Sequence, residues 1–251
     1  MILGLDVSTS NIGISLFSMD GELLKLTHIS LDDDKTPTSL QRYLYKAKLF
    51  ESFITKNFQM FDIQKIIIEE PLGGSVTPSI AVILSLFNEE IQHKCSVVFP
   101  KSEIIMFSVD NSRRYGLPEL LGGKKQSLFG SVPKEIEGVK INEFRKLLVM
   151  HLIGQKYPDI VWLLNNNYNL DKRNFDRADS VCVVLGYMFK EKIWNNPPAN
   201  VDIALEFVTK YINYEKFMKD NKTSSRKESS ILSINYLTDV FKMSDYINCA
   251  V

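Results

Sequence analysis

The stretch LGLDVSTSNIGISLF, residues 3 to 17, decides the fold. A short apolar strand over residues 2 to 7 carries Asp6, the polar run Ser8-Thr9-Ser10-Asn11 forms a turn, and residues 12 to 18 form a second strand. A carboxylate at the carboxyl end of a strand faces the edge of the sheet where open α/β sheets place their sites. Asp6 is therefore a candidate site residue, although an aspartate in this position is also a common turn former.

The spacing of apolar residues outside this stretch predicts a mixed sheet. A third strand follows a tight turn, so the first three strands are expected to be antiparallel. After them, helices alternate with runs of β-branched residues that are typical of buried parallel strands. The predicted elements are a strand over 23–31, a helix over 39–58, a strand over 65–70, a helix over 80–91, extended runs over 96–99 and 104–109, and helices over 141–156, 176–193, 200–219 and 229–242. This order predicts an α/β fold with a five-stranded sheet, three antiparallel then parallel strands, and helices on both faces.

Two segments fall outside this pattern. Residues 110–139 hold five glycines, two prolines and several basic residues, which predicts a long basic loop insertion. Residues 195–251 follow the Pro197-Pro198 break and predict a helical C-terminal extension. The remaining residues, 1–194, are expected to form one domain with the insertion inside it.

The composition is that of an ordinary globular protein, with 45% hydrophobic and 24% charged residues among 251. The formal net charge is zero, which counts mildly against a dedicated nucleic-acid-binding module but leaves the local field around a groove open. Cys95, Cys182 and Cys249 lack metal-ligand spacing and are expected to be reduced. No signal or membrane-spanning segment is evident, so we expect a cytoplasmic protein without membrane contact.

A second acidic signal closes the run KIIIEE, residues 65 to 70. Adjacent residues of a strand point to opposite faces, so at most one of Glu69 and Glu70 faces a given site. An ordinary strand end that meets solvent would explain the pair equally well. We choose Glu69 as the candidate.

The third signal is Asp176-Arg177-Ala178-Asp179 at the start of an apolar helix. A spacing of three places both carboxylates on one helical face, near the positive end of the helix dipole. Capping of the helix explains either aspartate alone. Two carboxylates on one face repel each other unless a cation lies between them, which favours a metal site.

Oxygen ligands of this kind suit Mg²⁺, with Mn²⁺ as a substitute, and no His/Cys cluster indicates zinc. Four carboxylates have the capacity for two ions, the arrangement that supports phosphodiester hydrolysis.

Three motifs together resemble one known family. LGLDVSTSNIGISLF is similar to the first motif of RuvC-type Holliday junction resolvases, the phage type among them, and of the RuvC domain in CRISPR effectors. KIIIEE resembles the second motif of that family, and DRADSVCVVLGY, residues 176 to 187, resembles the last. The motifs occur in the same order over residues 1 to about 193. The resemblance implies an RNase H-like fold.

The resemblance further implies a metal-dependent endonuclease. Asp6, Glu69, Asp176 and Asp179 would be the metal-binding catalytic set, holding two Mg²⁺ ions. The partners would be a second copy of the chain and a four-way DNA junction, nicked symmetrically to leave 5′-phosphate ends. Several family members insert an aromatic side chain three residues after the glutamate into the junction, and Leu72 holds that place here.

Basic residues supply the candidates for DNA contact. A cation near the scissile phosphate would balance developing charge, and paired basic residues would line a groove, although solvated surface charge explains each of them as well. The candidates for charge balance are Lys101, Lys124, Lys125 and Lys140, and those for the groove also include Arg113, Arg114, Arg145 and Lys146.

Three different functions also fit parts of the sequence. The first is a small-molecule kinase of the actin-like ATPase superfamily, similar to type III pantothenate kinases, which shares the opening strand, Asp and polar turn. Such a kinase also needs a second phosphate-binding turn and an adenosine-binding Gly-Gly pair, and Gly73-Gly74 and Gly122-Gly123 stand in the wrong context. The second is a binding module that has lost its metal, and the third is a nuclease for another branched, flapped or single-stranded DNA.

Overall fold

The computed structural model describes residues 1–31, 39–71, 78–108, 146, 149–150, 153–154, 156–163 and 171–191. The chain divides into two compact units, Met1–Glu119 with Asp176–Pro197, and Leu120–Phe175 with Pro198–Val251. All four candidate carboxylates belong to the first unit. The predicted boundary near residue 194 and the predicted insertion at 110–139 lie outside the described residues and stay predictions.

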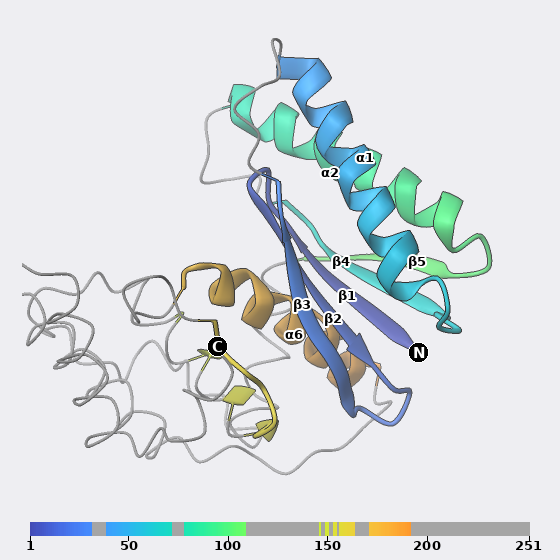
Figure 1. Ribbon diagram of the computed structural model, residues 1–251, viewed down its shortest axis with the longest axis vertical. Coiled ribbons are helices and arrows are strands. Elements are labelled where there is room, and N and C mark those ends of the chain that lie inside the picture. The colour runs from blue at the N-terminus through green and yellow to red at the C-terminus, as the bar shows by residue number, and fades with distance from the viewer. Residues whose placement is uncertain are drawn as a thin grey trace, which may run out of the picture. The chain divides into compact units, whose positions relative to one another are not determined.

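A five-stranded mixed sheet forms the centre of the first unit (Figure 1). The strands are β1 (Ile2–Val7), β2 (Asn11–Phe17), β3 (Leu23–Ser30), β4 (Lys65–Glu69) and β5 (Glu103–Phe107), in the spatial order β3-β2-β1-β4-β5. The first three strands are antiparallel, whereas β4 runs parallel to β1 and β5 parallel to β4. The sheet predicted from the sequence is therefore confirmed, with three antiparallel then parallel strands.

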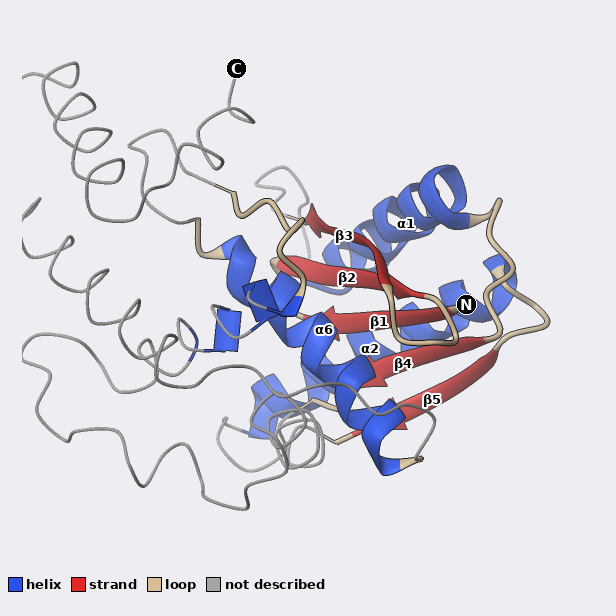
Figure 2. Cartoon of the chain, turned by 90° about the horizontal axis from the view of Figure 1, so that it is seen from below, coloured by secondary structure: helices blue, strands red, loops and turns tan. Residues whose placement is uncertain are grey.

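Helices cover both faces of the sheet, as Figure 2 shows from another direction. The described helices are α1 (Ser39–Phe58), α2 (Pro78–Val98) and α6 (Arg173–Lys190). Helices α1 and α2 pack together on one face and α6 lies on the other. Among the described helices, none is long and apolar enough to cross a membrane.

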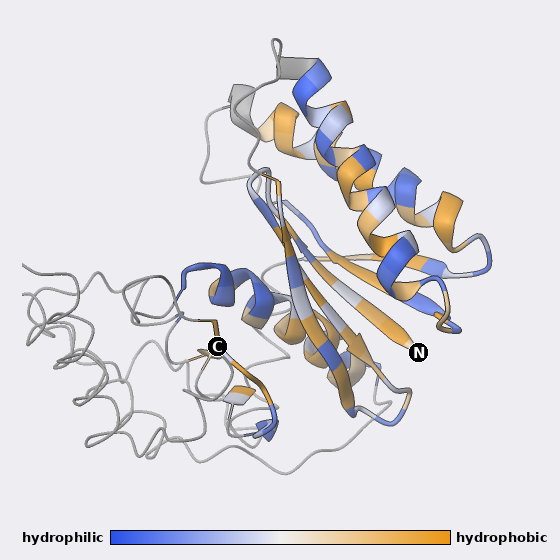
Figure 3. Ribbon diagram, viewed as in Figure 1, coloured by the Kyte–Doolittle hydropathy of each residue, from blue (hydrophilic) through white to orange (hydrophobic). Residues whose placement is uncertain are grey.

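The alternation of side chains along each strand assigns them to one face or the other. Leu3, Leu5 and Ile14 join the core beneath α1 and α2, where they meet Phe50 and Ile91. Figure 3 shows the apolar residues along the strands of the sheet and in the later turns of α6. The residues between these core positions, including Gly4, Asp6 and Gly13, consequently face α6.

Small residues let α6 approach the sheet closely. A Cβ atom on Gly13 would lie 1.9 Å from the backbone oxygen of Asp176, and one on Gly4 would lie 2.6 Å from the backbone oxygen of Ser180. Between these glycines, the buried Ser15 hydroxyl donates a hydrogen bond of 2.9 Å to the Ser180 carbonyl. Only residues with little or no side chain fit at this contact, and this fixes where α6 begins relative to β1 and β2.

One predicted element is wrong. Residues 96–98 belong to α2 rather than to an extended run, and α2 is longer than the helix predicted over 80–91. Cys95 and Ile91 continue the buried stripe of the helix at a spacing of four, and a short apolar run alone does not separate strand from buried helix. The described residues between 146 and 156 are helical, as predicted. The helices predicted over 200–219 and 229–242 lie outside the described residues.

Candidate metal centre

Asp6 and Glu69 stand side by side at one edge of the sheet. The parallel register of β1 and β4 pairs Gly4 with Ile67 and Leu5 with Ile68, so the next residues along both strands, Asp6 and Glu69, are neighbours on the α6 face. A side-chain hydrogen bond joins the two carboxyls. Glu70 is exposed, and alternation directs it to the opposite face, as expected for the second residue of an adjacent pair.

The start of α6 brings the other two acids to the same place. Asp6 pairs directly with Gly13 across β1 and β2, and the Asp176 backbone lies against Gly13. Asp179 follows on the same face of the helix, one turn later. Both carboxylates act electrostatically on Asp6. Four acids from two strands and one helix are thus gathered in the first unit of the chain.

Helix capping does not account for Asp176 or Asp179. The helix begins at Arg173, and the Asp171 carboxylate accepts a hydrogen bond of 2.9 Å from the Arg173 backbone N–H. Asp171 also pairs with the Arg173 guanidinium. The cap is therefore filled by a residue outside the candidate set. The two aspartates stand further along the helix, where a cap has no role.

The electrostatics of the cluster centre on Asp6. Desolvation by burial raises the pKa of the Asp6 carboxyl well above its ordinary value, and the negative charges of Glu69, Asp179 and Asp176 act in the same direction. Each added negative charge disfavours ionisation of the carboxyl that it faces. A cation bound among these groups would reverse that effect, since it favours the charged form of all four.

The donor chemistry of this cluster fits a hard divalent cation. Carboxylate oxygens are the ligands that Mg²⁺ and Mn²⁺ prefer. The buried side-chain oxygen of Asn11, which alternation in β2 places on the same face, has no hydrogen-bond partner in the described part of the chain. Within the described residues, no three His, Cys, Asp or Glu side chains are arranged to hold a metal ion in the metal-free structure. Cation binding would therefore draw the four carboxylates closer together.

Of the other predicted site residues, the structure describes only Lys101 and Lys146. Lys101 is exposed in the turn before β5, at the edge of the sheet opposite to the carboxylates. Lys146 belongs to the second unit, where its ammonium lies 5.4 Å from the centre of the Phe175 ring. The remaining predicted DNA contacts lie outside the described residues: Leu72, Arg113, Arg114, Lys124, Lys125, Lys140 and Arg145.

Sequence reasoning missed the residues that support the cluster. Arg177, between the two helical aspartates, is buried and donates to the Leu26 carbonyl on β3 at 3.2 Å. Lys46 and Asn88 are buried polar side chains on α1 and α2. The sequence offers a signal only for Gly13 and Ser15, which are small residues at alternate positions of an otherwise apolar strand.

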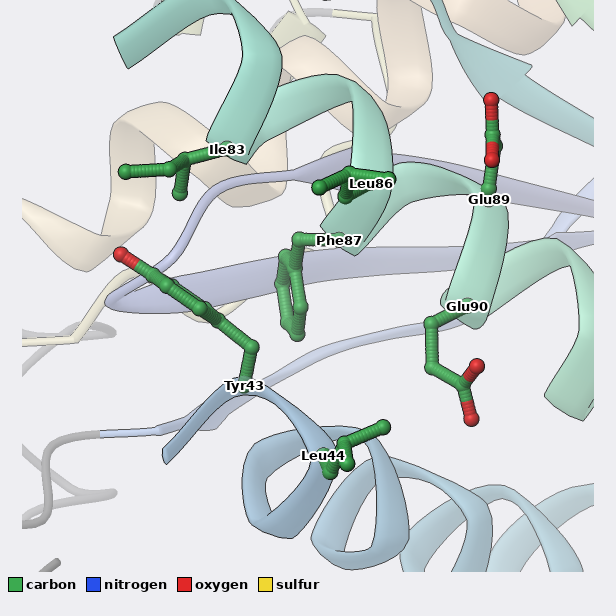
Figure 4. Close-up of a pocket in the computed structure, with 7 residues that line it drawn as sticks. All are labelled: Tyr43, Leu44, Ile83, Leu86, Phe87, Glu89 and Glu90. Carbon is green, nitrogen blue, oxygen red and sulfur yellow. The ribbon is translucent and has the colours of Figure 1, made fainter. Parts of the chain in front are cut away.

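A separate apolar groove of about 410 Å³ lies between α1 and α2, on the other side of the sheet from the carboxylates (Figure 4). Its floor and walls are mainly apolar and one end is acidic. The lining residues are Tyr43, Leu44, Ile83, Leu86, Phe87, Glu89 and Glu90. Leu86 and Val82 on α2 are 55% and 58% exposed. The groove is distinct from the carboxylate cluster.

Comparison with solved structures identifies the fold. No protein-family model matches this chain, and no curated protein matches it. The yeast mitochondrial Holliday junction resolvase Ydc2 matches with a TM-score of 0.51 at 11% identity, over 84% of this chain and 83% of Ydc2. At this identity the similarity shows the fold alone.

Other solved structures match with lower scores. RuvC of Thermus thermophilus, alone and in complex with a Holliday junction substrate, gives TM-scores of 0.46 and 0.47 at 11% and 10% identity, over 76% of this chain and 95% and 94% of RuvC. A putative sugar kinase from Cytophaga hutchinsonii gives 0.28 at 16% identity, over 47% of this chain and 39% of the kinase. These lower scores carry no argument here. The strand order and the Ydc2 match together give this chain the RNase H-like fold of the RuvC-like Holliday junction resolvases.

Proposed function

We propose that this protein is a divalent-metal-dependent endonuclease that resolves four-way DNA junctions. The main support is the cluster of four carboxylates, in which Glu69, Asp176 and Asp179 raise the pKa of the central Asp6. Burial and mutual repulsion make the ionised carboxylates unfavourable in the metal-free protein. A bound cation would offset that cost in free energy. The RuvC-like fold supports DNA as the substrate, and it does so by analogy.

Each carboxylate has a distinct place in the proposed site. Asp6 is central to the cluster, and Glu69, Asp176 and Asp179 would hold two Mg²⁺ ions together with it. Bound ions lower the pKa of water and stabilise a leaving oxygen in phosphodiester hydrolysis. Gly13 and Ser15 allow the helix backbone to lie against β2, which brings the helical pair of carboxylates to the strand pair.

A cleavage assay tests the proposal directly. Labelled synthetic four-way junction and linear duplex of matched sequence are incubated with the protein in Mg²⁺ or in EDTA. We expect paired, symmetric nicks with 5′-phosphate ends in the junction, which are lost in EDTA and in the variants Asp179→Asn and Glu69→Gln. Glu70→Gln is the matched control, since its side chain is exposed and follows Glu69 directly, and we expect it to cut like the wild type.

Three results would change the proposal. Cutting of the linear duplex as well as the junction would support the nuclease activity but refute selectivity for junctions. Equal loss in Glu69→Gln and Glu70→Gln would refute the assignment of Glu69. Absence of cutting on every DNA, together with ATP binding, would favour a small-molecule kinase instead.

Symmetric cleavage requires two active sites, and we propose a homodimer assembled through the groove between α1 and α2. An exposed apolar surface of this kind is typical of an interaction site. Basic Arg42 and Lys48 on α1 and acidic Glu89 on α2 are exposed, so the two helices supply charges of opposite sign for a two-fold interface.

Sedimentation measures this assembly. Leu86→Glu is expected to give monomers, because it places a charge in the middle of the apolar surface. Met60→Glu is the matched control, since Met60 is 78% exposed in the turn after α1, and it is expected to leave the dimer intact. A wild-type monomer at micromolar concentration would refute the dimer.

A cytoplasmic location stays a prediction of the sequence.

A further inference from the structure

Two buried polar side chains reach the carboxylate edge of the sheet from the face opposite to α6. The first is Asn88 on α2, which is 3% exposed. Its Nδ2 donates a hydrogen bond of 3.2 Å to the backbone carbonyl of Glu69. Its Oδ1 accepts one of 3.3 Å from Gln92, one turn further along the helix. The amide is therefore held at both ends, and it fixes the last residue of β4.

The second is Lys46 on α1, which is 6% exposed. Its ammonium donates a hydrogen bond to the backbone carbonyl of Thr9, in the turn that joins β1 to β2. That turn follows Asp6 directly and is closed by hydrogen bonds between Ser8 and Asn11. A lysine is almost never this buried unless its ammonium has polar partners, since burying a charge is costly. Lys46 therefore ties α1 to the turn that ends the Asp6 strand.

One contact ends on Glu69, a proposed metal ligand, and the other ends on Thr9, in the turn three residues after Asp6. The positions of Lys46 and Asn88 are next to Ala47 and Phe87, which are buried in the hydrophobic core. Apolar side chains at these two positions would therefore also pack in that core, so packing alone does not explain the polar residues. We propose that Lys46 and Asn88 are positioning residues, which keep the turn after Asp6 and the strand end of Glu69 in place beside the proposed metal site. This inference rests on the proposed metal site and deepens it by assigning support to α1 and α2.

The inference separates two contributions to the site. The α6 face sets the position of Asp176 and Asp179 through Gly13 and Ser15. On the α1 and α2 face, the described contacts are the hydrogen bond from Lys46 to the turn after β1 and the one from Asn88 to the last residue of β4. Loss of either hydrogen bond removes none of the four carboxylates, but it allows the segment that the bond holds to move. A carboxylate that is displaced in this way binds the metal more weakly.

Direct Mn²⁺ binding to the full chain, measured by the electron paramagnetic resonance signal of the free ion, tests the inference. The variants Lys46→Met and Asn88→Leu remove the donors and keep side chains of similar size. We expect each to weaken Mn²⁺ binding by about threefold to tenfold, which is less than the roughly 10–100-fold loss seen when a ligand's own hydrogen-bond partner is removed. Lys46→Arg retains N–H donors and is expected to restore binding.

A matched control separates positioning from general stability. The Ser102 hydroxyl donates a hydrogen bond of 2.6 Å to the Ile63 carbonyl, at the opposite end of β4. Ser102→Ala is expected to lower the unfolding temperature in EDTA without changing Mn²⁺ affinity. If Asn88→Leu does not fold, Asn88→Ser removes the amide with a smaller side chain and is measured in its place.

The outcomes distinguish this inference from the proposed function. Wild-type protein that binds no Mn²⁺, or a Glu69→Gln variant that binds it as tightly as the wild type, would refute the metal site itself. Wild-type binding that weakens in Glu69→Gln but not in Lys46→Met or Asn88→Leu would leave the metal site standing and overturn the positioning role. An equal loss of affinity in Ser102→Ala would also overturn it.

Discussion

Substitution of Gly13 by alanine tests how the close approach of α6 builds the carboxylate cluster. The added Cβ would lie 1.9 Å from the Asp176 oxygen, 2.3 Å from its carbonyl carbon and 2.9 Å from the Arg177 nitrogen. All three are backbone atoms in the first turns of α6, so no side-chain rotation relieves the overlap. Either the helix start or β2 must move.

The size of that movement follows from the contact distances. Ordinary contacts of a Cβ atom begin at 3.4 Å, so the Asp176 backbone must retreat by about 1.5 Å (3.4 minus 1.9). Overpacking costs about 1–3 kcal/mol, and we expect the upper end because both backbones are held in regular structure. For a chain of this size, about 3 kcal/mol lowers the unfolding temperature by roughly 6–12 °C.

The same movement carries Asp176 and Asp179 away from Asp6. A misplacement of about 1 Å can reduce a reaction rate by about 100-fold. We therefore expect Gly13→Ala to lose junction cleavage and to weaken Mn²⁺ binding by about tenfold or more. Thermal unfolding in EDTA and Mn²⁺ titration are the two measurements.

The matched control is Gly154→Ala in the second unit. There the new Cβ would lie 3.1 Å from Trp162 Nε1 and at least 3.8 Å from the other nearest atoms, and alanine favours a helical position by about 1 kcal/mol. The 3.1 Å contact requires the Trp162 ring to move by a few tenths of an ångström, a cost that the gain in helix propensity offsets. This variant is therefore expected to stay close to wild-type stability and to keep metal binding. Unchanged unfolding temperature and Mn²⁺ affinity in Gly13→Ala would refute the close packing of α6 on β2 and, with it, the placement of the helical aspartates.

Three further predictions concern the same unit. Folding raises the pKa of Asp6, so the protonated carboxyl contributes stability that is lost as pH rises above the ordinary carboxyl value. Asp6→Asn should thus stabilise the protein in EDTA more at pH 8 than at pH 5, and urea unfolding that shows the reverse order would contradict this sign. Ser15→Ala removes the hydrogen bond to Ser180 and should cost about 1 kcal/mol in the same assay, whereas no loss would mean that the bond is replaced. Burial raises the pKa of the Cys95 thiol, so a thiol reagent should modify it only after denaturation, and rapid labelling of the native protein would contradict its burial.

The sequence predicted the elements that its local patterns specify. Alternation in the first 31 residues and the run of isoleucines before Glu69 are properties of neighbouring residues, and they predicted four strands to within one residue. The extended run over 104–109 predicted the fifth strand to within two residues. The helix over 39–58 was predicted with the observed bounds. The extension of α2 through residue 98 escaped prediction, because a short apolar run fits a strand and a buried helix equally.

The four acidic residues were predicted from the sequence alone, but only the tertiary structure shows that they lie close together. Local reasoning could not exclude helix capping for Asp176, and only the observed start of α6 and its cap by Asp171 remove that explanation. Lys46 and Asn88 carry no pattern in the sequence, because the backbone carbonyls that they contact lie 37 and 19 residues away.

Periodicity and motif spacing thus determined which residues form strands and which carry oxygen donors, since both depend on neighbours along the chain. The tertiary structure decided which face of the sheet each donor occupies, how closely α6 approaches it, and which buried polar groups support it. Those outcomes depend on contacts between residues far apart in sequence, where the absence of a Cβ atom at Gly13 matters as much as the presence of a carboxylate at Asp176.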